Sequence, residues 1–590
     1  MKINYLLSMS MILFLFFIVS CSSGESAPDA QNNTIAESDA LSDSDIVQSE
    51  DEEIPVDSEN SENESVLDSD EEIISDNDKL ISFAEPADFG DPEALIVTND
   101  ELKDAFKKLA VIHTLTGIYT EVVTVSEICA QSNCTEDPKT DIPAAIKSFA
   151  QKQTGLKYLI LGGDIEIVPS RKLHDKYKNL VAGTFEEDFY TDYYFADFAD
   201  WDSNKNGIYA EDEDSGIDFR PEIAVGRIPV SLSSEPGIEP DVEALIYIDK
   251  VISYMTNYNT ADMLKSAFLA NVATKFQGIS VNAGFYFETE GRTISLFPES
   301  FKKRRLYAES TPAPVPDAEK LSVELHKDVF KQGTNIIVHN GHGYPSALSL
   351  EQGDKERVSW FYGTEAYKLE NTTYPIYLSC ACQAAQFEAP FIWHTIYQEK
   401  EYNVEFKEDA AGELLVNAPL GGAIAYLGNS TTGLGLAGGS QFIDKMIEYF
   451  FANDAPILAD AIKYAHEKLP EQDSFKPPII GINIPVVDPD SYRWTQKSVT
   501  MLGDILIPVY NKEIPKGETP LITKETVDGG IMITISLNSQ QNLKLFADGK
   551  YYIPENIGNN LFVFKIKGVL SKIFVGYTSE FNQSYFAPVE

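Results

Sequence analysis

Basic residues are scarce in this chain. Lys and Arg number 46 against 92 Asp and Glu, which gives a formal net charge of −46 over 590 residues. Binding to DNA or RNA phosphates requires basic patches, so this balance argues against nucleic acid as a partner. The acidity is uneven, because residues 25–78 carry about twenty Asp and Glu and no Lys or Arg. Such a segment buries too little apolar surface to fold, and we interpret residues 22–85 as a disordered acidic tether.

Cysteines and long hydrophobic runs are also few. The chain has 5 cysteines, and their spacing relative to histidine matches no zinc site. The N-terminal apolar run, residues 6–19, is too short for a comfortable membrane span but suits the core of a signal peptide. It leads into residues 18–21, which resemble a bacterial lipobox with Cys21 as the lipidated residue. An ordinary signal peptide with an incidental cysteine is the alternative. We therefore expect an exported protein, with signal peptide 1–21, anchored to the cell envelope through lipid on Cys21, at the outer membrane or cell surface.

The remaining sequence predicts two α/β regions followed by a β region. Apolar strands at 94–97, 121–125 and 156–161 alternate with helices at 101–115 and 141–153. A second set has strands at 267–272, 335–339, 375–379 and 422–427, with a helix at 318–332. This alternation indicates parallel α/β sheets. Short strands at 532–537 and 560–564, separated by Gly-rich turns, indicate a β-sandwich. We place the boundaries at 86–265, 266–510 and 511–590.

Two reactive side chains stand at the ends of predicted strands. His342 lies between Gly341 and Gly343 after one strand, and Cys382 follows another. If these strands are neighbours, imidazole and thiol meet at one edge of the sheet, as nucleophilic catalysis by cysteine requires. A protonated histidine lowers the pKa of a nearby thiol, so we expect His342 to promote alkylation of Cys382 at mildly acidic to neutral pH. A lone histidine or cysteine is more often structural, and the paired placement favours catalysis here.

These segments resemble the gingipain family of cysteine peptidases. That family carries Gly-His-Gly after one strand and Ala-Cys, with an aromatic residue five positions later, after the next. The matching residues here are 341–343, 381–382 and Phe387. Further matching motifs span the chain from residue 94 onward: residues 158–164 with Pro169, 192–194, 226–229, 361–364, 421–423 and 503–504. The resemblance implies a caspase-like fold, with an N-terminal α/β subdomain, a catalytic α/β subdomain and a C-terminal immunoglobulin-like domain.

The resemblance also assigns roles. It implies that Cys382 is the nucleophile, that His342 is the acid/base, and that the backbone N–H groups of Gly343 and Cys382 form the oxyanion hole. Cys380 falls where the family has an apolar residue, so we expect a buried thiol and keep it as the alternative nucleophile. His339 is expected to be structural, with a lesser claim as the base.

The substrate pocket does not carry over. Well-known family members cleave after Arg or Lys by means of an acidic residue beyond the strand that corresponds to 267–272. The matching stretch here, residues 275–284, contains no Asp or Glu, and Glu288 and Glu290 lie farther on. The residue preference is therefore open.

A calcium loop is predicted in the N-terminal region. Oxygen ligands at the EF-hand positions would come from Asp202, Asn204, Asn206, the carbonyl of Ile208, and Glu213, with Gly207 at the sixth position. Two charged ligands predict weak affinity and a structural role for Ca²⁺. The alternative is a polar turn without an ion.

Together these features predict an exported cysteine endopeptidase that hydrolyses proteins or peptides through an acyl-enzyme and needs no cofactor for catalysis. A surface binding or adhesion protein on a catalytically retired fold is the alternative. Self-processing of the tether is a third reading.

Overall fold

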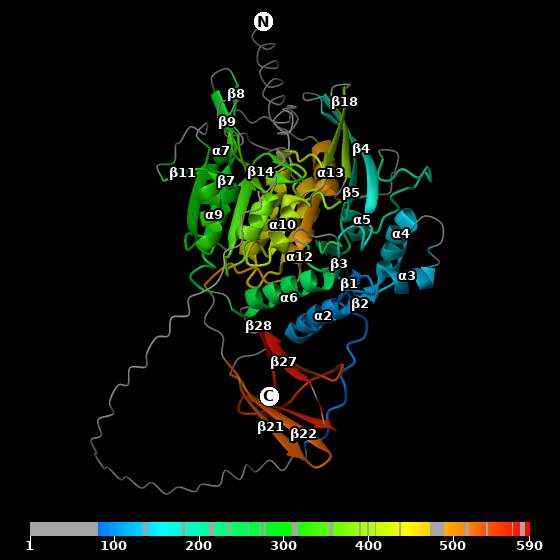
Figure 1. Ribbon diagram of the computed structural model, residues 1–590. Helices are drawn as coiled ribbons and strands as arrows, with labels where there is room; N and C mark the ends of the chain where they lie inside the picture. The colour runs from blue at the N-terminus through cyan, green and yellow to red at the C-terminus, as the bar shows by residue number, and fades with distance from the viewer. Residues whose placement is uncertain are drawn as a thin grey trace, which may run out of the picture. The chain divides into compact units, whose positions relative to one another are not determined.

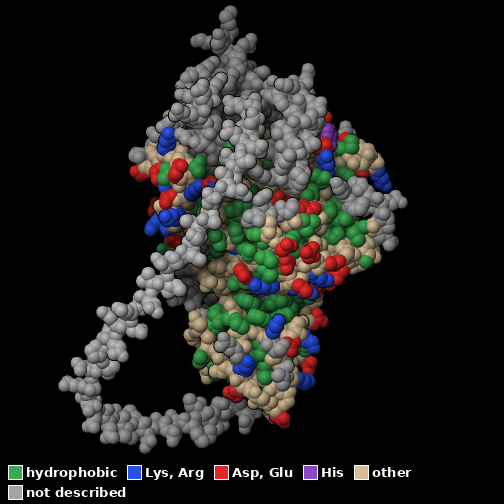
Figure 2. Space-filling model, in the orientation of Figure 1, with side chains coloured by type: hydrophobic (Ala, Val, Ile, Leu, Met, Phe, Trp, Pro, Cys, Tyr) green, Lys and Arg blue, Asp and Glu red, His purple; other side chains and the backbone are tan. Residues whose placement is uncertain are grey.

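The computed structural model describes residues 81–590 except 133, 135–137, 180–182, 212–216, 233–236, 258, 271–272, 277–278, 309–314, 316, 353–357, 389–390, 398–399, 407–408, 436–437, 472–488, 514–518, 539–540, 569, 571, 579–583 and 590. The predicted signal peptide, nearly all of the acidic tether, and Cys21 lie outside the described residues. Among the described residues no helix combines the length and the apolar character needed to cross a bilayer. On the face shown in Figure 2, acidic and basic side chains are interspersed over the described surface.

An 11-stranded sheet organises the α/β part of the chain (Figure 1). Its order is β11-β10-β7-β12-β16-β19-β20-β6-β3-β1-β2. The strands from the first predicted region are β1 (Ala94–Thr98), β2 (Thr120–Thr124), β3 (Tyr158–Gly162) and β6 (Ala224–Ile228). Those from the second are β7 (Lys265–Ala270), β10 (Lys302–Tyr307), β11 (Glu319–Lys320), β12 (Ile336–Asn340), β16 (Ile376–Ser379), β19 (Ala425–Asn429) and β20 (Val499–Gly503). One sheet therefore runs through both predicted α/β regions.

The sheet is mostly parallel, as the sequence predicts. Each pair of neighbouring strands is parallel except β19 and β20, which are antiparallel. Strands β1, β3, β6, β12, β16, β19 and β20 are buried along their whole length. Continuous burial is what a parallel sheet covered on both faces requires, and it explains their uninterrupted apolar sequences.

Helices connect and cover these strands. Their bounds are α2 (Lys103–Thr116), α3 (Val125–Ser132), α4 (Pro138–Gln151), α5 (Tyr193–Ala196), α6 (Pro240–Thr256), α7 (Ala283–Glu288), α8 (Thr293–Leu296), α9 (Val323–Lys331), α10 (Ala411–Asn417), α11 (Gly439–Ala452), α12 (Leu458–Lys468) and α13 (Pro489–Ser498), with 3-10 turns η1 (Gly363–Lys368) and η3 (Leu469–Glu471). The helix predicted at 318–332 begins later than predicted, at Val323. Ser322 caps α9 by accepting from the N–H of Leu325 at 3.2 Å, and the two residues of β11 pair with β10 instead.

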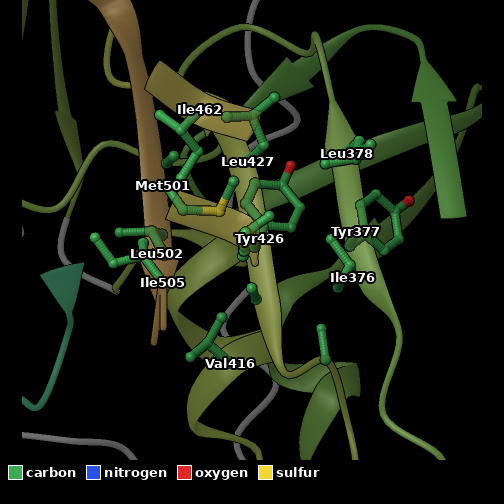
Figure 3. Close-up of a cluster of buried hydrophobic side chains, with 14 of the residues drawn as sticks. Ile376, Tyr377, Leu378, Val416, Tyr426, Leu427, Ile462, Met501, Leu502 and Ile505 are labelled. Atoms are coloured by element: carbon green, nitrogen blue, oxygen red, sulfur yellow. The ribbon is translucent and has the colours of Figure 1, made fainter. Parts of the chain in front are cut away.

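The core between the central strands is shown in Figure 3. The labelled side chains come from β16, β19, β20, the helices α10 and α12, and the turn after β20: Ile376, Tyr377, Leu378, Val416, Tyr426, Leu427, Ile462, Met501, Leu502 and Ile505. The rings of Tyr377 and Tyr426 stack with centroids 5.2 Å apart. This packing fixes the relative positions of β16, which precedes the cysteine segment, and its neighbour β19.

Three smaller sheets adjoin the large one, and the sequence analysis predicted none of them. Strands β4 (Arg171–Asn179), β5 (Gly183–Thr191), β17 (Phe391–Tyr397) and β18 (Lys400–Phe406) form a sheet in the order β18-β17-β5-β4. In Figure 1 the cyan β5 therefore lies beside strands far along the chain. Strands β13 (Gly343–Tyr344), β14 (Ala347–Gln352) and β15 (Val358–Tyr362) form the second, and β8 (Ala273–Phe276) pairs with β9 (Ile279–Asn282) in the third.

The C-terminal region folds as the predicted β-sandwich. Two antiparallel sheets have the orders β21-β22-β26-β25 and β24-β23-β27-β28. Their strands are β21 (Leu521–Val527), β22 (Gly530–Ser536), β23 (Gln541–Ala547), β24 (Lys550–Tyr552), β25 (Glu555–Gly558), β26 (Leu561–Lys567), β27 (Ile573–Thr578) and β28 (Ser584–Pro588). The alternating burial of β22 directs Ile531, Ile533 and Ile535 into a separate apolar core. The arrangement fits an immunoglobulin-like domain.

Candidate active site

The histidine segment follows the central strand β12. At the end of this strand the side chain of Asn340 donates from Nδ2 to Oγ of Ser440 at 2.7 Å. The chain then enters β13, and the N–H of Ser349 on β14 donates to the carbonyl oxygen of His342 at 3.0 Å. These bonds fix the backbone of His342 at the carboxyl end of β12, where the sequence predicts it.

The cysteine segment follows the neighbouring strand β16, in register with His339 opposite Ser379. Oγ of Ser379 accepts from the N–H of Ala381 at 3.1 Å and lies 2.9 Å from Nδ1 of His339. Directly after Cys382, Gln383 has a φ of 57°, in the left-handed region that residues with a side chain seldom adopt. Backbone strain of this kind gathers at functional sites, and here it marks a sharp bend just after the thiol.

Gly343 brings the two segments into contact. A Cβ added to Gly343 would lie 2.8 Å from Cβ of Ala381 and 2.8 Å from the carbonyl oxygen of Cys382. The residue next to His342 therefore packs directly on the peptide of Cys382, and a larger side chain would separate them. The structure thus places the two predicted catalytic residues on adjoining strand ends.

The same glycine has an N–H that the β13–β14 ladder does not use. Because Ser349 donates to His342, the adjacent pair of Gly343 and Leu348 is the non-hydrogen-bonded kind in this antiparallel register. The N–H of Gly343 is accordingly directed away from β14. This orientation is compatible with the predicted oxyanion donor.

The imidazole of His342 is neutral at neutral pH. Burial lowers the pKa of His342 to about 4 from its ordinary value of 6.5. His339 beside it is buried too, and its pKa is also lowered to about 4. This lowered pKa argues against the expected imidazolium at His342 in the resting protein, and the expected effect of His342 on alkylation of Cys382 stays a prediction. A neutral imidazole is the form that accepts a proton.

Cys380 is a buried thiol, and that prediction is confirmed. It is 2% exposed, its Sγ lies 3.7 Å from the carbonyl oxygen of His339, and burial raises its pKa to about 12. Cys382 is buried as well, at 4% exposed. His339 likewise is buried and bonded to Ser379, in keeping with the structural role expected for it.

A loop that the sequence analysis did not single out contacts the thiol. It follows β19, and Sγ of Cys382 donates to the carbonyl oxygen of Gly433 at 3.5 Å. The N–H of Gln383 donates to the carbonyl oxygen of Thr431 at 2.9 Å. The loop is bonded in turn to the buried Glu187 of β5. Glu187 lies in the run Glu186, Glu187, Asp188, which as sequence looks like a solvated charged turn, so no sequence signal identified it.

Several motif residues meet behind the cysteine segment. The guanidinium of Arg227 lies 4.5 Å from the ring centroid of Phe387 and is paired with Asp192 through bonds of 2.8 Å and 2.7 Å. Arg227 also donates to the carbonyl oxygens of Gly163 and Val168 at 2.7 Å and 3.0 Å. This buried ion pair, in which each guanidinium nitrogen donates a hydrogen bond, holds β3, β6 and the cysteine segment together.

Comparison with known proteins identifies the family. The model for peptidase family C25 matches residues 87–510. The chain belongs to peptidase family C25. An uncharacterized protein of Archaeoglobus fulgidus is 22% identical over 412 residues, covering 65% of this chain and 89% of that protein.

Solved C25-like structures share the fold. The crystal structure of the Arg-specific cysteine proteinase gingipain R (RgpB) matches with a TM-score of 0.54 and 15% identity, covering 86% of this chain and 99% of that one. The complex of Porphyromonas gingivalis RgpB pro- and mature domains matches with a TM-score of 0.51 and 15% identity, covering 84% and 99%. The resemblance deduced from the motifs is confirmed, and this C25 chain is a member of a cysteine peptidase family.

In this C25 chain, the two acidic residues beyond β7, Glu288 and Glu290, lie in different surroundings. Glu288 accepts from Nε of Arg305 at 2.7 Å and from the hydroxyl of Tyr307 at 2.6 Å. Glu290 is exposed. The side chains of residues 275–283 lie outside the described ones. The contacts of Glu288 make it part of an ion pair with β10.

The C25 chain carries three carboxylates that could hold a cation. One oxygen from each of Asp164, Asp409 and Glu413 lies within 4.8 Å of the others. Burial raises the pKa values of Asp164 and Glu413 well above their usual range. Oδ2 of Asp164 is buried and finds no hydrogen-bond partner among the described residues. A buried, unpartnered oxygen of Asp164 beside two other carboxylates suits a hard divalent cation such as Ca²⁺. The sequence analysis missed this group because its members are distant in sequence.

The predicted calcium loop of this C25 chain is a tight polar turn. Asp202 accepts from the N–H of Asn206 at 2.9 Å and of Gly207 at 3.2 Å, while Nδ2 atoms of Asn204 and Asn206 donate to Glu211 at 3.2 Å and 2.5 Å. The carbonyl residue Ile208 donates its N–H to Asn206 at 2.8 Å. Glu213 lies outside the described residues, so the loop as a calcium site stays a prediction.

Proposed function

We propose that this chain is an exported, lipid-anchored cysteine endopeptidase in which Cys382 attacks the scissile carbonyl and His342 moves the proton. The observation that carries the proposal is the contact of Gly343 with Cys382, which sets the histidine and cysteine segments against each other at the end of the sheet. Membership of the C25 family supports the reaction class.

Because the imidazole of His342 is neutral, it can accept a proton in the first step of the proposed reaction. His342 takes the thiol proton of Cys382 as the sulfur attacks the peptide carbonyl carbon. The oxyanion that forms is held by the N–H groups of Gly343 and Cys382. The tetrahedral intermediate collapses to an acyl-enzyme, and the leaving amine receives its proton from His342. Water then attacks the acyl group, His342 accepts its proton, and the acid product leaves with the thiol restored.

A peptide-library digest tests this proposal. Purified protein without its signal peptide is incubated with a mixed peptide library, beside the Cys382→Ala variant. We expect cleavage products, read by mass spectrometry, from the wild type only. The residue on the amino side of the cut then gives the preference that the sequence leaves open. Equal products from both proteins would refute Cys382 as the nucleophile.

A binding protein on a retired peptidase fold is the second candidate. The observation that favours it is the burial of Cys382, which is 4% exposed and bonded to the loop above it. A thiol-reactive peptide probe separates the two candidates. Labelling of Cys382 by the peptide probe, at a rate well above that of its non-peptide reactive group, supports the peptidase. Equal rates support the binding protein.

A further inference from the structure

The loop after β19 covers the thiol on one side. Within this loop, residues 430–433, the carbonyl oxygen of Gly433 accepts from Sγ of Cys382 at 3.5 Å. Asn429, at the start of the loop, donates from Nδ2 to the carbonyl oxygen of Ala381 at 2.9 Å. A Cβ on Gly433 would lie 2.8 Å from the carbonyl oxygen of Cys380, so the loop backbone lies against the cysteine segment. The position of this loop therefore sets the position of Sγ.

Glu187 of β5 anchors that loop. Its side chain is 1% exposed, and it accepts from Oγ1 of Thr432 at 2.6 Å, from the N–H of Thr432 at 3.2 Å, and from Oγ1 of Thr431. Burying a carboxylate is costly unless hydrogen bonds replace its water, and bonds to a charged acceptor are stronger than neutral ones. Three donors from two successive loop residues meet that requirement. Glu187 is thus bonded through its side chain to the loop that touches Cys382.

Helix α13 supports the loop from another side. Nε1 of Trp494 donates to the carbonyl oxygen of Thr432 at 2.7 Å, and the N–H of Ser430 donates to the carbonyl oxygen of Ser498 at 2.8 Å. Asp175 lies opposite Glu187 in the β4–β5 register and is paired with Lys497 of the same helix. The β4–β5 hairpin and α13 together hold the loop by its backbone and its side chains.

We propose that Glu187 is a positioning residue for the catalytic thiol: it fixes the 430–433 loop, whose Gly433 carbonyl holds Sγ of Cys382 in place. This inference rests on the proposed peptidase function for its kinetic part. It gives the N-terminal α/β region, which supplies β5, an indirect role in the active site. In this proposal Glu187 acts through the loop and not on the reacting atoms themselves.

Two pairs of variants test the proposal. Glu187→Gln removes the charge, and Glu186→Gln is its matched control, because Glu186 is the preceding residue, is 28% exposed, and is paired with Lys176 and His174. Thr432→Val removes the hydroxyl donor at constant size, whereas Thr432→Ser keeps it. The measurements are kcat and KM per titrated active site, and the alkylation rate of each cysteine by iodoacetamide, read by mass spectrometry.

We expect Glu187→Gln and Thr432→Val to lower kcat about ten- to a hundredfold with KM nearly unchanged, the size of effect that misplacement of a reacting group produces. Release of the loop uncovers Sγ, so alkylation of Cys382 should rise at least about fivefold while that of Cys380 stays slow. Glu186→Gln and Thr432→Ser should match the wild type. The alkylation rate of Cys380, which is buried two residues away, reports general opening of the protein.

A parallel rise at Cys380 and Cys382 would show general loosening and overturn the proposal, as would an unchanged Cys382 rate with unchanged kcat. If Glu187→Gln does not fold, Thr432→Val against Thr432→Ser decides the matter. The alkylation measurement needs no turnover. A wild type without hydrolysis would therefore reject the proposed function, while a selective rise at Cys382 in the variants would still uphold the positioning role.

Discussion

At the scale of single residues, small side chains and desolvation shape the site more than charge does. Gly343 and Ala381 let the histidine and cysteine segments touch. The burial that results keeps the imidazole of His342 neutral, with its pKa near 4. In the proposed reaction, a neutral imidazole needs no thiolate–imidazolium ion pair in the resting protein, and proton transfer and attack would take place together when substrate arrives.

The two neighbouring cysteines should differ sharply in function. Cys382→Ala should lower kcat by about 10⁴ or more, the loss typical of a removed nucleophile. Cys380→Ala removes a buried sulfur that has a pKa of about 12, so it should keep most activity and cost about 1 kcal/mol of stability. Active-site-normalised hydrolysis and thermal unfolding of both variants check this. Loss of activity in Cys380→Ala with retention in Cys382→Ala would move the nucleophile by two residues.

As pH is lowered, activity should be lost near the pKa that His342 has in the folded protein. Because that pKa is lowered to about 4, the imidazole stays able to accept a proton down to about pH 5. The plot of kcat/KM against pH should fall as pH drops through about 4, not through the ordinary value near 6.5. Circular dichroism at each pH separates this fall from unfolding. An acid limb near 6.5 in folded protein would contradict the desolvated state of the site.

Two of the residues discussed could be predicted from sequence, and one could not. His342 and Cys382 follow apolar strands and are flanked by Gly and Ala, so their placement at the sheet edge follows from the parallel-strand pattern. Glu187 lies between Glu186 and Asp188, and only the alternation of an unpredicted strand turns its side chain inward. A buried carboxylate inside an acidic run carries no local sequence signal.

At the scale of elements, the buried strands were predictable and the charged hairpin was not. Strands β3, β12 and β16 appear as apolar runs because both their faces are covered. Strand β4 instead has the sequence RKLHDKYKN, and cross-strand ion pairs such as Lys176 with Glu186 stabilise it. Such pairing depends on a partner strand and leaves no apolar pattern. The strands that precede His342 and Cys382 were therefore predicted, while the β4–β5 hairpin that anchors the 430–433 loop was not.

The contact between strand ends should be sensitive to a single methyl group. Gly343→Ala would place Cβ 2.8 Å from the carbonyl oxygen of Cys382, and overpacking of this kind costs about 1–3 kcal/mol. We expect at least a tenfold loss of kcat/KM, because His342 is moved from the thiol. Hydrolysis is measured beside the folded fraction at the same temperature. Activity that falls only in proportion to the folded fraction would argue against this contact as the determinant of alignment.

At the scale of the whole molecule, one sheet unites regions that the sequence presents as separate. β20 pairs with both β19 and β6, so the two α/β regions share a continuous ladder. The sequence predicts the regions from their alternating elements, but not this junction, because pairing between distant strands depends on tertiary contacts. The fold class and the C-terminal sandwich were predicted. The lipid anchor and location stay predictions, since Cys21 lies outside the described residues.

Lipid attachment should depend on Cys21 alone. The short apolar core that leads into residues 18–21 motivates this expectation. Wild-type protein in its native host, or in a bacterium that processes lipoproteins, should incorporate a fatty-acid analogue and fractionate with membranes. Cys21→Ser should lose the label and appear in the soluble or secreted fraction. An unlabelled wild type would reject the anchor and leave an ordinary signal peptide.

The carboxylates at the junction should make stability depend on calcium. Asp164 comes from the first α/β region, and Asp409 and Glu413 come from the second. An ion that binds only the folded state adds RT ln(1 + [L]/Kd), about 2.7 kcal/mol at a hundredfold excess over Kd. We expect millimolar Ca²⁺ to raise the Tm, Glu413→Gln to remove most of the rise, and Asp202→Ala to remove any part due to the 202–213 loop. If calcium raises the Tm of Glu413→Gln and of Asp202→Ala equally, the ion binds elsewhere.

The pH dependence of that stabilisation has a definite sign. The folded pKa values of Asp164 and Glu413 are raised, so without an ion these groups stabilise the folded state while protonated and lose that contribution as pH rises through their folded pKa values. Calcium must displace the protons, so its effect on Tm should grow from pH 5 to pH 8. In chelator, the wild type should lose stability over the same range, and Glu413→Gln should lose less because its amide does not ionise. A calcium shift independent of pH would show that these carboxylates are not the ligands, and the raised pKa of Asp164 would then reflect only burial beside the carboxylates of Glu166 and Asp409.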